Sequence, residues 1–277
     1  MFPFKTSLNA STLFPFQLDV IQQIEITKQA GYDGIELWVR DIEDYLSNGG
    51  TIQSIQTALE RTNLSFINAI AFFKWADKDQ STREKAFEQA EKEMKLLASL
   101  GCISIAAPPF GNVKSVHLDE ISQYFERLVL LGRDIGIEPI LEFWGKAEQL
   151  STLTQARYII DKVNISSPKI LIDPFHMYIG GSDFSELKNI QANQIGVVHV
   201  NDYPTTPIKE NLVDRDRVFP GEGIGNTKEM GLVLAQRGFN GYLSLELFIE
   251  DYGDQSPLEV AKYGLQTMID SYSVNRI

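Results

Sequence analysis

The sequence predicts an α/β protein of the (β/α)8 TIM-barrel class, folded as a single domain over residues 1–277. Eight short apolar runs, each about the length of one strand, alternate with segments that carry apolar residues at helical spacing. Such runs are typical of parallel strands that are covered on both faces. No low-complexity linker divides the chain, and one barrel of this class commonly fills about 250 residues.

The expected strands are short and rich in branched or aromatic apolar residues. The segment after the first of them, LNASTLFPF, lacks the glycine-rich phosphate loop that usually follows the first strand of a doubly wound open sheet. The closed barrel is therefore favoured over the open sheet. In chain order the strands are expected at residues 4–8, 34–39, 64–71, 101–106, 138–144, 169–173, 195–201 and 241–247.

The expected helices are amphipathic, as in the run from Leu118 to Leu128, where apolar residues recur three or four positions apart. Several of them end at a glycine just before the next strand, as at Gly31 and Gly136, which is a common way for a helix to stop. They are expected at residues 19–30, 51–61, 82–100, 118–135, 152–163, 185–189, 228–237 and 257–272.

The composition limits the classes of molecule that the protein can bind. A formal net charge of −12 argues against nucleic acid, because nucleic-acid binding draws most of its affinity from Lys and Arg at phosphates. A small neutral or lightly charged substrate is expected instead. The single cysteine, Cys102, excludes an internal disulfide and a Cys-rich zinc site. No signal peptide or membrane span is recognised, so a cytoplasmic location is expected, and a homo-oligomer is left open.

Four of the later strands carry a metal-binding side chain near their ends. Asp173 follows the buried run KILI, where an unpaired carboxylate would cost several kcal/mol. Glu142, His199 and Glu246 stand near the ends of strands five, seven and eight. Functional residues of such barrels lie at the carboxyl ends of the strands, so the four are expected to meet. As a set they suit Mn²⁺, Mg²⁺, Co²⁺ or Zn²⁺, whereas any one alone could be a structural ion pair.

Glu142 and Glu246 come from the two strands that bound this group, so they are expected to approach a bound substrate from different sides. One carboxylate is then available for each face of a carbon atom, with the metal stabilising an enediolate between them. The pattern predicts proton transfer next to a carbonyl.

A longer set of motifs around these residues resembles a known family. Essentially the whole chain is similar to the xylose isomerase-like TIM-barrel superfamily of sugar phosphate isomerases and epimerases. Within it the spacing is most similar to that of the inosose isomerases, and the ketose 3-epimerases are more distant. The set comprises Glu142, Asp173-Pro-Phe-His176, His199-Val-Asn-Asp202, Arg217-Val-Phe-Pro220-Gly221-Glu222-Gly223 and Glu246.

The resemblance implies a sugar or cyclitol isomerase or epimerase with one divalent metal ion, held by the four strand-end residues. It also implies that Glu142 and Glu246 double as acid and base, and that His176 and Arg217 hold substrate oxygens. A dehydratase of an inosose or a dehydroshikimate-like acid would use the same site and is the alternative. An AP endonuclease of this fold needs many histidines for its three zinc ions, and this chain has three histidines in all. A non-enzymatic sugar-binding protein is the remaining class.

Residues 203–226 form an unusually long connection, and loops of that length in a compact domain usually bind or cover a ligand. The loop is expected over the mouth of the barrel. Arg217 within it is expected to contact substrate, with a solvated charge cluster as the alternative. His176 either contacts substrate or orients Asp173. Asp202 is expected to cap the loop rather than bind a second metal ion.

Three tryptophans, Trp38, Trp75 and Trp144, fall at or just beyond strand ends on the same rim. They are expected to form an apolar wall against the carbon face of the substrate, with ordinary packing as the alternative. Glu36 either binds a substrate hydroxyl or pairs with Arg40. Nothing resembles a dedicated phosphate loop, so a phosphorylated substrate is not favoured over a free sugar or cyclitol.

Overall fold

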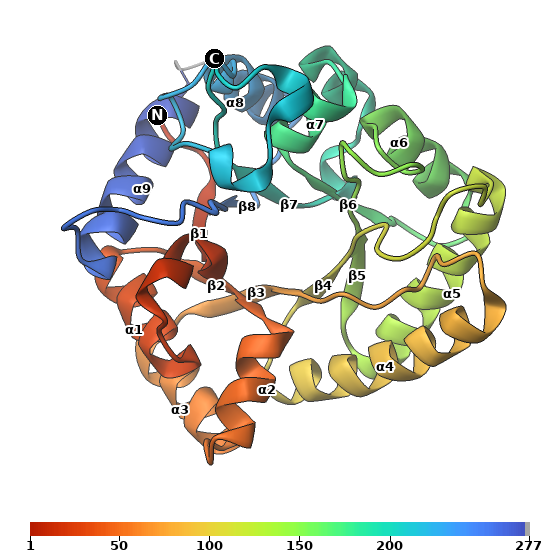
Figure 1. Cartoon of the computed structure of the whole chain (residues 1–277), viewed down its shortest axis with the longest axis horizontal. Helices are drawn as coiled ribbons and strands as arrows, with labels where there is room; N and C mark the ends of the chain where they lie inside the picture. The colour runs from red at the N-terminus through yellow and green to blue at the C-terminus, as the bar shows by residue number, and fades with distance from the viewer. Residues whose placement is uncertain (275–277) are drawn as a thin grey trace.

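The computed structural model describes residues 1–274, and within them eight parallel strands close into a barrel (Figure 1). Their order around the barrel follows the chain, and β8 closes on β1, with Leu243 opposite Thr6. The (β/α)8 class and the eight predicted strands are confirmed. The strands are β1 (Lys5–Asn9), β2 (Gly34–Trp38), β3 (Ser65–Ile70), β4 (Ser104–Ala107), β5 (Glu138–Leu141), β6 (Lys169–Ile172), β7 (Ile195–Val200) and β8 (Tyr242–Leu245).

Helices surround the strands as an outer ring (Figure 1). Those predicted by the apolar spacing are present, except that residues 185–189 lie in a 3-10 helix, η2 (Phe184–Asn189). Gly31 and Gly136 end their helices with φ of 101° and 99°, a conformation that strains any other residue. The α-helices are α1 (Val20–Ala30), α3 (Ile52–Thr62), α4 (Gln80–Ser99), α5 (Leu118–Ile135), α6 (Leu153–Lys162), α8 (Thr227–Gln236) and α9 (Pro257–Tyr272).

Two short helices were not predicted, α2 (Val39–Ser47) after β2 and α7 (Pro174–Gly180) after β6. Both begin directly at a strand end and are too short to show a clear helical repeat. Asp173 caps α7 with its side chain, and Pro174 stands in the first turn, where its missing N–H costs nothing. Short 3-10 turns complete the connections: η1 (Ala10–Phe16), η3 (Ala192–Gln194), η4 (Lys209–Asn211) and η5 (Asp214–Asp216).

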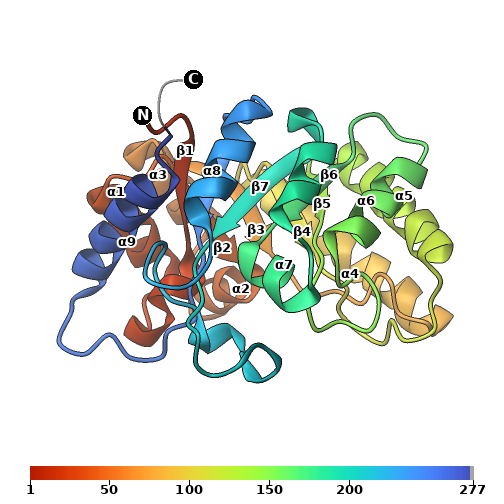
Figure 2. The ribbon, with the colours of Figure 1, turned by 90° about the horizontal axis from the view of Figure 1, so that it is seen from above.

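The two ends of the barrel have different roles. Figure 2 shows the N-terminus at one end, and the cyan segment that contains the loop 203–226 at the other. The second end is therefore the mouth formed by the carboxyl ends of the strands. No helix formed by residues 1–274 has the length and apolar character needed to cross a membrane.

Apolar side chains fill the layer between strands and helices, as the fully buried Ile35, Leu171 and Leu245 illustrate. Close to the mouth the barrel also encloses polar side chains, among them Glu36 and His199, which are equally buried. Buried polar groups are tolerated only when they are hydrogen-bonded or paired. The partners of this polar layer are therefore expected among the side chains at the mouth of the barrel.

Candidate metal centre and its cavity

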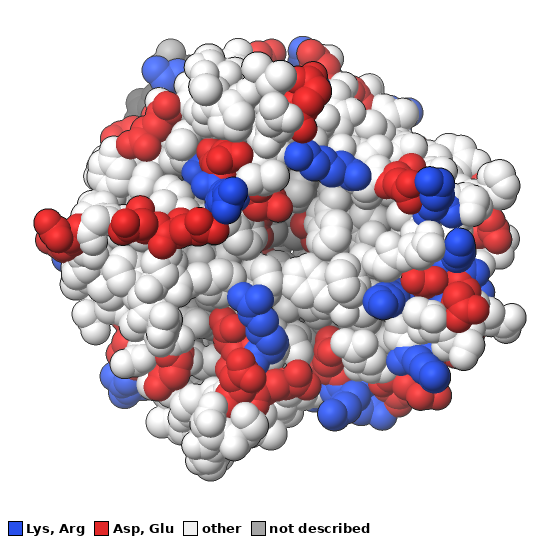
Figure 3. Space-filling model, in the orientation of Figure 1, with Lys and Arg blue, Asp and Glu red and all other residues white. Residues whose placement is uncertain are grey.

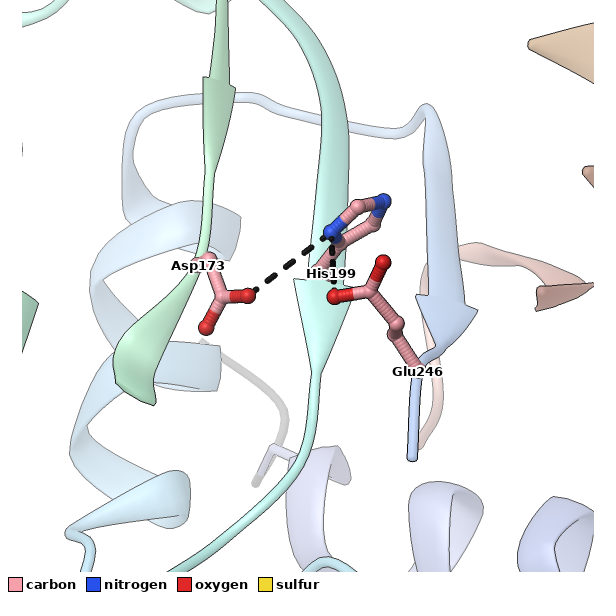
Figure 4. Close-up of side chains that lie close together, drawn as sticks. All are labelled: Asp173, His199 and Glu246. Atoms are coloured by element: carbon pink, nitrogen blue, oxygen red, sulfur yellow. Dashed lines mark ion pairs between the residues drawn. The ribbon is translucent and has the colours of Figure 1, made fainter. Parts of the chain in front are cut away.

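Three neighbouring strands bring three of the four expected metal ligands together (Figure 4). Asp173 directly follows β6, His199 lies in β7, and Glu246 directly follows β8. One donor atom from each lies within 4.8 Å of the others, and all three residues are buried. Among residues 1–274 Glu142 lies outside this group, although it lines the same cavity.

The start of α7 and two neighbours hold the carboxylate of Asp173. Its Oδ1 accepts hydrogen bonds from the backbone N–H of Phe175 at 2.8 Å and from Asn201 at 3.2 Å. Its Oδ2 accepts one from Arg217 Nη1 at 3.0 Å. Burial alone would raise the pKa of Asp173, but Arg217 and the nearby histidines outweigh burial and hold that pKa well below its usual range. The group is therefore an ionised carboxylate with a fixed direction.

The two ring nitrogens of His199 have different surroundings. Nε2 lies 3.2 Å from the carboxylate of Glu36, which is fully buried in β2. Nδ1 lies 3.0 Å from Glu246 Oε2 but has no partner of hydrogen-bonding geometry among the described residues. A metal-ligating histidine uses one nitrogen for the ion and the other for a carboxylate or carbonyl partner. The residues present therefore fit a divalent ion on the Nδ1 side.

The carboxylates around His199 demand positive charge. Burial opposes protonation of His199, but Glu246 and Glu36 outweigh it and raise the pKa of His199 well above its usual value. Arg217 brings a second cation, with Nη1 2.5 Å from Glu246 Oε2. Buried carboxylates this close together are tolerated only beside compensating positive charge. A divalent metal ion would meet the same demand.

Arg217 is buried in this network, with a side chain only 1% exposed, so it is not part of a solvated charge cluster. Its Nη2 contacts Asp214 at 2.8 Å and His176 Nε2 at 3.4 Å. The guanidinium also lies over the rings of Phe175 and Phe248, 4.7 and 5.1 Å from their centroids. His176 lies in the first turn of α7, not in a loop, and its ring contacts Arg217. Both residues line the cavity.

Asp202 fixes the loop that carries Arg217. Its buried carboxylate accepts hydrogen bonds from the backbone N–H of Gly221 at 3.1 Å and of Gly225 at 2.7 Å. Its backbone forms a two-bond bridge with Val218, next to Arg217. A Cβ atom on Gly223 would lie 2.3 Å from Asp202 Oδ1, so only glycine permits this close approach. Asp202 caps the loop, as the sequence predicted.

Glu142 directly follows β5 and is 6% exposed at the cavity wall. Burial raises the pKa of Glu142 to about 8; His199 acts against this shift, and Glu246 adds to it. A carboxyl group with such a pKa can hold or release a proton near neutral pH, which is the property of a general acid or base.

The cavity at the mouth has a volume of about 730 Å³. The polar residues of its lining include Glu142 and Glu246 together with Arg217 and His176, and we call this group the polar side. The aromatic residues of its lining include Trp38 and Trp144, and we call this group the aromatic side. The loop 203–226 contributes Leu212, Val213, Asp214 and Arg217 to the lining.

Residues 24–271 match the model of the xylose isomerase-like TIM barrel family. The chain belongs to this family. It is 25% identical over 263 residues to the inosose isomerase of Halalkalibacterium halodurans, with 92% of each chain covered. It is 24% identical over 258 residues to the 3-dehydroshikimate dehydratase of Pseudomonas aeruginosa, covering 90% of this chain and 39% of the dehydratase. A crystal structure of the IOLI protein with a bound zinc atom has the same fold, with a TM-score of 0.88, 23% identity, and coverage of 97% of this chain and 98% of that chain.

Two residues predicted to contact substrate lie elsewhere in this xylose isomerase-like barrel. Trp75 is fully buried, donates a hydrogen bond to the carbonyl of Pro108 at 2.7 Å, and packs on Phe125 of α5. Glu36 is fully buried beneath His199 and does not pair with Arg40, whose partner is Asp41. The apolar wall therefore contains Trp38 and Trp144 but not Trp75, and Glu36 supports His199 instead of facing the cavity.

Three asparagines that support the carboxylates were not predicted. Asn9, at the end of β1, donates to Glu246 Oε1 at 3.2 Å and accepts a hydrogen bond from Trp38 at 3.0 Å. Asn68 in β3 donates to Glu36 at 2.7 Å. Asn201 directly follows β7 and holds Asp173 as described above. Two of them stand at strand ends, so the same positional signal that marked the acids could have found Asn9 and Asn201.

Proposed function

We propose that this chain is a divalent-metal-dependent isomerase or epimerase that moves a proton next to the carbonyl of a sugar or cyclitol. The single observation that supports it best is His199, whose Nδ1 lies between the carboxylates of Asp173 and Glu246 and has no hydrogen-bond partner within residues 1–274. The similarity to an inosose isomerase also supports an enzyme of this reaction class.

Asp173, His199 and Glu246 would hold the ion, and Glu142 would complete the set from β5. When bound, a divalent ion supplies positive charge next to the substrate's carbonyl oxygen and so favours loss of the neighbouring proton. Mn²⁺, Mg²⁺, Co²⁺ and Zn²⁺ all suit these donors. The IOLI structure contains a zinc atom, which makes Zn²⁺ the first ion to test.

The proton itself is moved by Glu142 and Glu246 in this proposal. One takes it from the carbon next to the carbonyl. The same glutamate or the other one then returns a proton, in an isomerase to the former carbonyl carbon and in an epimerase to the opposite face of the original carbon. The amide of Asn9 holds Oε1 of Glu246 at 3.2 Å, which fixes the direction of that carboxylate. Arg217 and His176 would donate hydrogen bonds to substrate oxygens.

A dehydratase is the second candidate, because the 3-dehydroshikimate dehydratase relative matches 90% of this chain. It would begin with the same proton abstraction. The two reactions then diverge, since a hydroxyl group on the neighbouring carbon leaves as water in the dehydratase.

Deuterium uptake tests the proposal. The protein is loaded with Zn²⁺ or Mn²⁺ in D₂O and given inososes, ketoses and hydroxypyruvate, and the products are followed by NMR. Metal-dependent deuterium incorporation next to the carbonyl, with all oxygen atoms retained, is the expected result. Loss of water would favour the dehydratase. Failure to bind any divalent ion after reconstitution would contradict the proposal.

A further inference from the structure

The cavity is larger than a free sugar or cyclitol requires. At about 30 Å³ for each water-sized group, its 730 Å³ hold roughly two dozen such groups, about twice the non-hydrogen atoms of a hexose or an inosose. Sites of this volume bind ligands of drug size. Part of the cavity therefore lies beyond a sugar ring placed at the metal ligands.

An aromatic wall lines part of the cavity. It consists of Trp38, Phe72, Phe110, Trp144 and Phe248, which all line the cavity. Phe72 is at its centre, with ring centroids 5.3 Å from Trp38, 5.4 Å from Phe110 and 6.0 Å from Trp144. Phe248 joins through Trp38 at 6.1 Å. The rings form one connected surface.

This wall is more than core packing, because Phe72, Phe110, Trp144 and Phe248 remain half-buried although each touches other rings. Aromatic surface left against water is unfavourable, and ligand pockets are lined mainly by apolar and aromatic side chains. Figure 3 shows acidic atoms in and beside the central hollow, with uncharged surface also bordering it.

The polar and aromatic sides are adjacent. Glu142 and Trp144 stand two residues apart at the end of β5, and both line the cavity. A ring whose reacting carbon is near Glu142 therefore has the aromatic wall within the length of one substituent.

We propose that the substrate is a keto sugar or keto cyclitol that carries an aromatic or similarly flat apolar substituent, as in an aryl glycoside. The ring with the carbonyl occupies the polar side, and the substituent packs on the aromatic wall. This inference rests on the proposed function, because that function places the reacting ring at the metal ligands.

Two non-reactive probes test the substituent directly. Phenyl β-D-glucopyranoside and methyl β-D-glucopyranoside share the sugar ring and differ in the aromatic group. In calorimetric titrations of the metal-loaded protein, the phenyl probe is expected to bind at least about tenfold more tightly, because its ring leaves water and contacts aromatic faces. Equal affinities, or no binding of either probe, overturn the inference.

A matched pair of variants locates the effect. Phe110→Leu removes an aromatic face of the wall and is expected to reduce the phenyl preference about threefold. Phe16→Leu is the control, because Phe16 is also half-buried and stacked on another ring, Tyr252, but does not line the cavity. It is expected to keep the full preference. An equal loss in both variants overturns the assignment to the aromatic wall.

Deuterium exchange with free inososes and ketoses, on the same preparation, tests the proposed function separately. If free ketones exchange deuterium but the phenyl and methyl probes bind equally well, the aromatic substituent is rejected and the proposed reaction stands. A phenyl preference without exchange of any ketone, aryl ketoglycosides included, rejects the reaction and leaves the aromatic subsite.

Discussion

The two sides of the cavity are held together differently. On the polar side each group is fixed by several directed contacts: Asp173 accepts hydrogen bonds from four different residues, and Arg217 contacts Asp173, Glu246 and Asp214. On the aromatic side the ring centroids of Phe72 and Trp144 lie 6.0 Å apart, and both side chains remain partly exposed. Proton transfer and metal binding need fixed geometry, whereas apolar contact tolerates movement. The polar side should therefore determine the reaction and the aromatic side the choice of substrate.

The largest expected effect is on the polar side. Glu142→Gln keeps the shape of the side chain but removes its acid–base function, so kcat is expected to fall about a thousandfold. Steady-state kinetics on a substrate found by deuterium exchange provide the measurement.

Glu148→Gln is the matched control, because Glu148 lines the same cavity but is exposed and paired with Lys114. Its kcat is expected to stay within about twofold of wild type, because Glu148 has no role in the proposed proton transfer and its exposed ion pair adds little to stability. A Glu142→Gln variant that retains a tenth of the wild-type kcat would show that this carboxyl group is not an acid or base in the reaction.

Removal of the metal is expected to lower the activity about a hundredfold or more. The substrate's carbonyl oxygen then loses the neighbouring positive charge that favours loss of the proton. Metal removal should also lower the melting temperature by about 5 °C, since an ion at a hundred times its Kd adds roughly 2.7 kcal/mol to stability. Calorimetry before and after chelation checks this. Identical melting curves with and without added Zn²⁺ or Mn²⁺ would show that the polar side binds neither ion.

Glu36→Gln tests whether the layer below the polar side supports the metal. The variant keeps the packing but loses the carboxylate opposite His199 Nε2, so the affinity for Zn²⁺ is expected to fall about 10- to 100-fold. Glu93→Gln is the control, a buried glutamate in α4 hydrogen-bonded to Gln89. If titration gives both variants the wild-type affinity, Glu36 does not orient the ligand.

The fold was accessible from the sequence because each strand is a short apolar run and because glycines such as Gly31 punctuate the helices. The polar side was accessible for a related reason: one carboxylate or imidazole at the end of a buried strand could be a structural ion pair, but four of them at the ends of successive strands indicate a site. Asp173 and Glu246 could therefore be named from position alone, as could His199.

What the sequence could not supply is the direction of a side chain within a layer. Glu36 and Trp38 stand two residues apart in β2, yet one is enclosed under His199 and the other lines the cavity. Trp75 and Trp144 both lie beyond strand ends, but the connection after β3 turns Trp75 towards Phe125. Such choices depend on loop geometry and on partners distant in the chain, so neither composition nor spacing contains them.

The smallest expected effect is on the aromatic side. Phe72→Leu removes the ring that contacts three others and is expected to raise KM about fivefold, since aromatic contacts add roughly 0.5–1.5 kcal/mol beyond their area. The change in kcat should be smaller than the change in KM, because Phe72 lies away from the transferred proton. Phe16→Leu should leave both constants unchanged. A fall in kcat as large as that of Glu142→Gln would mean that the rings help to hold the reacting geometry, and the division between the two sides would no longer stand.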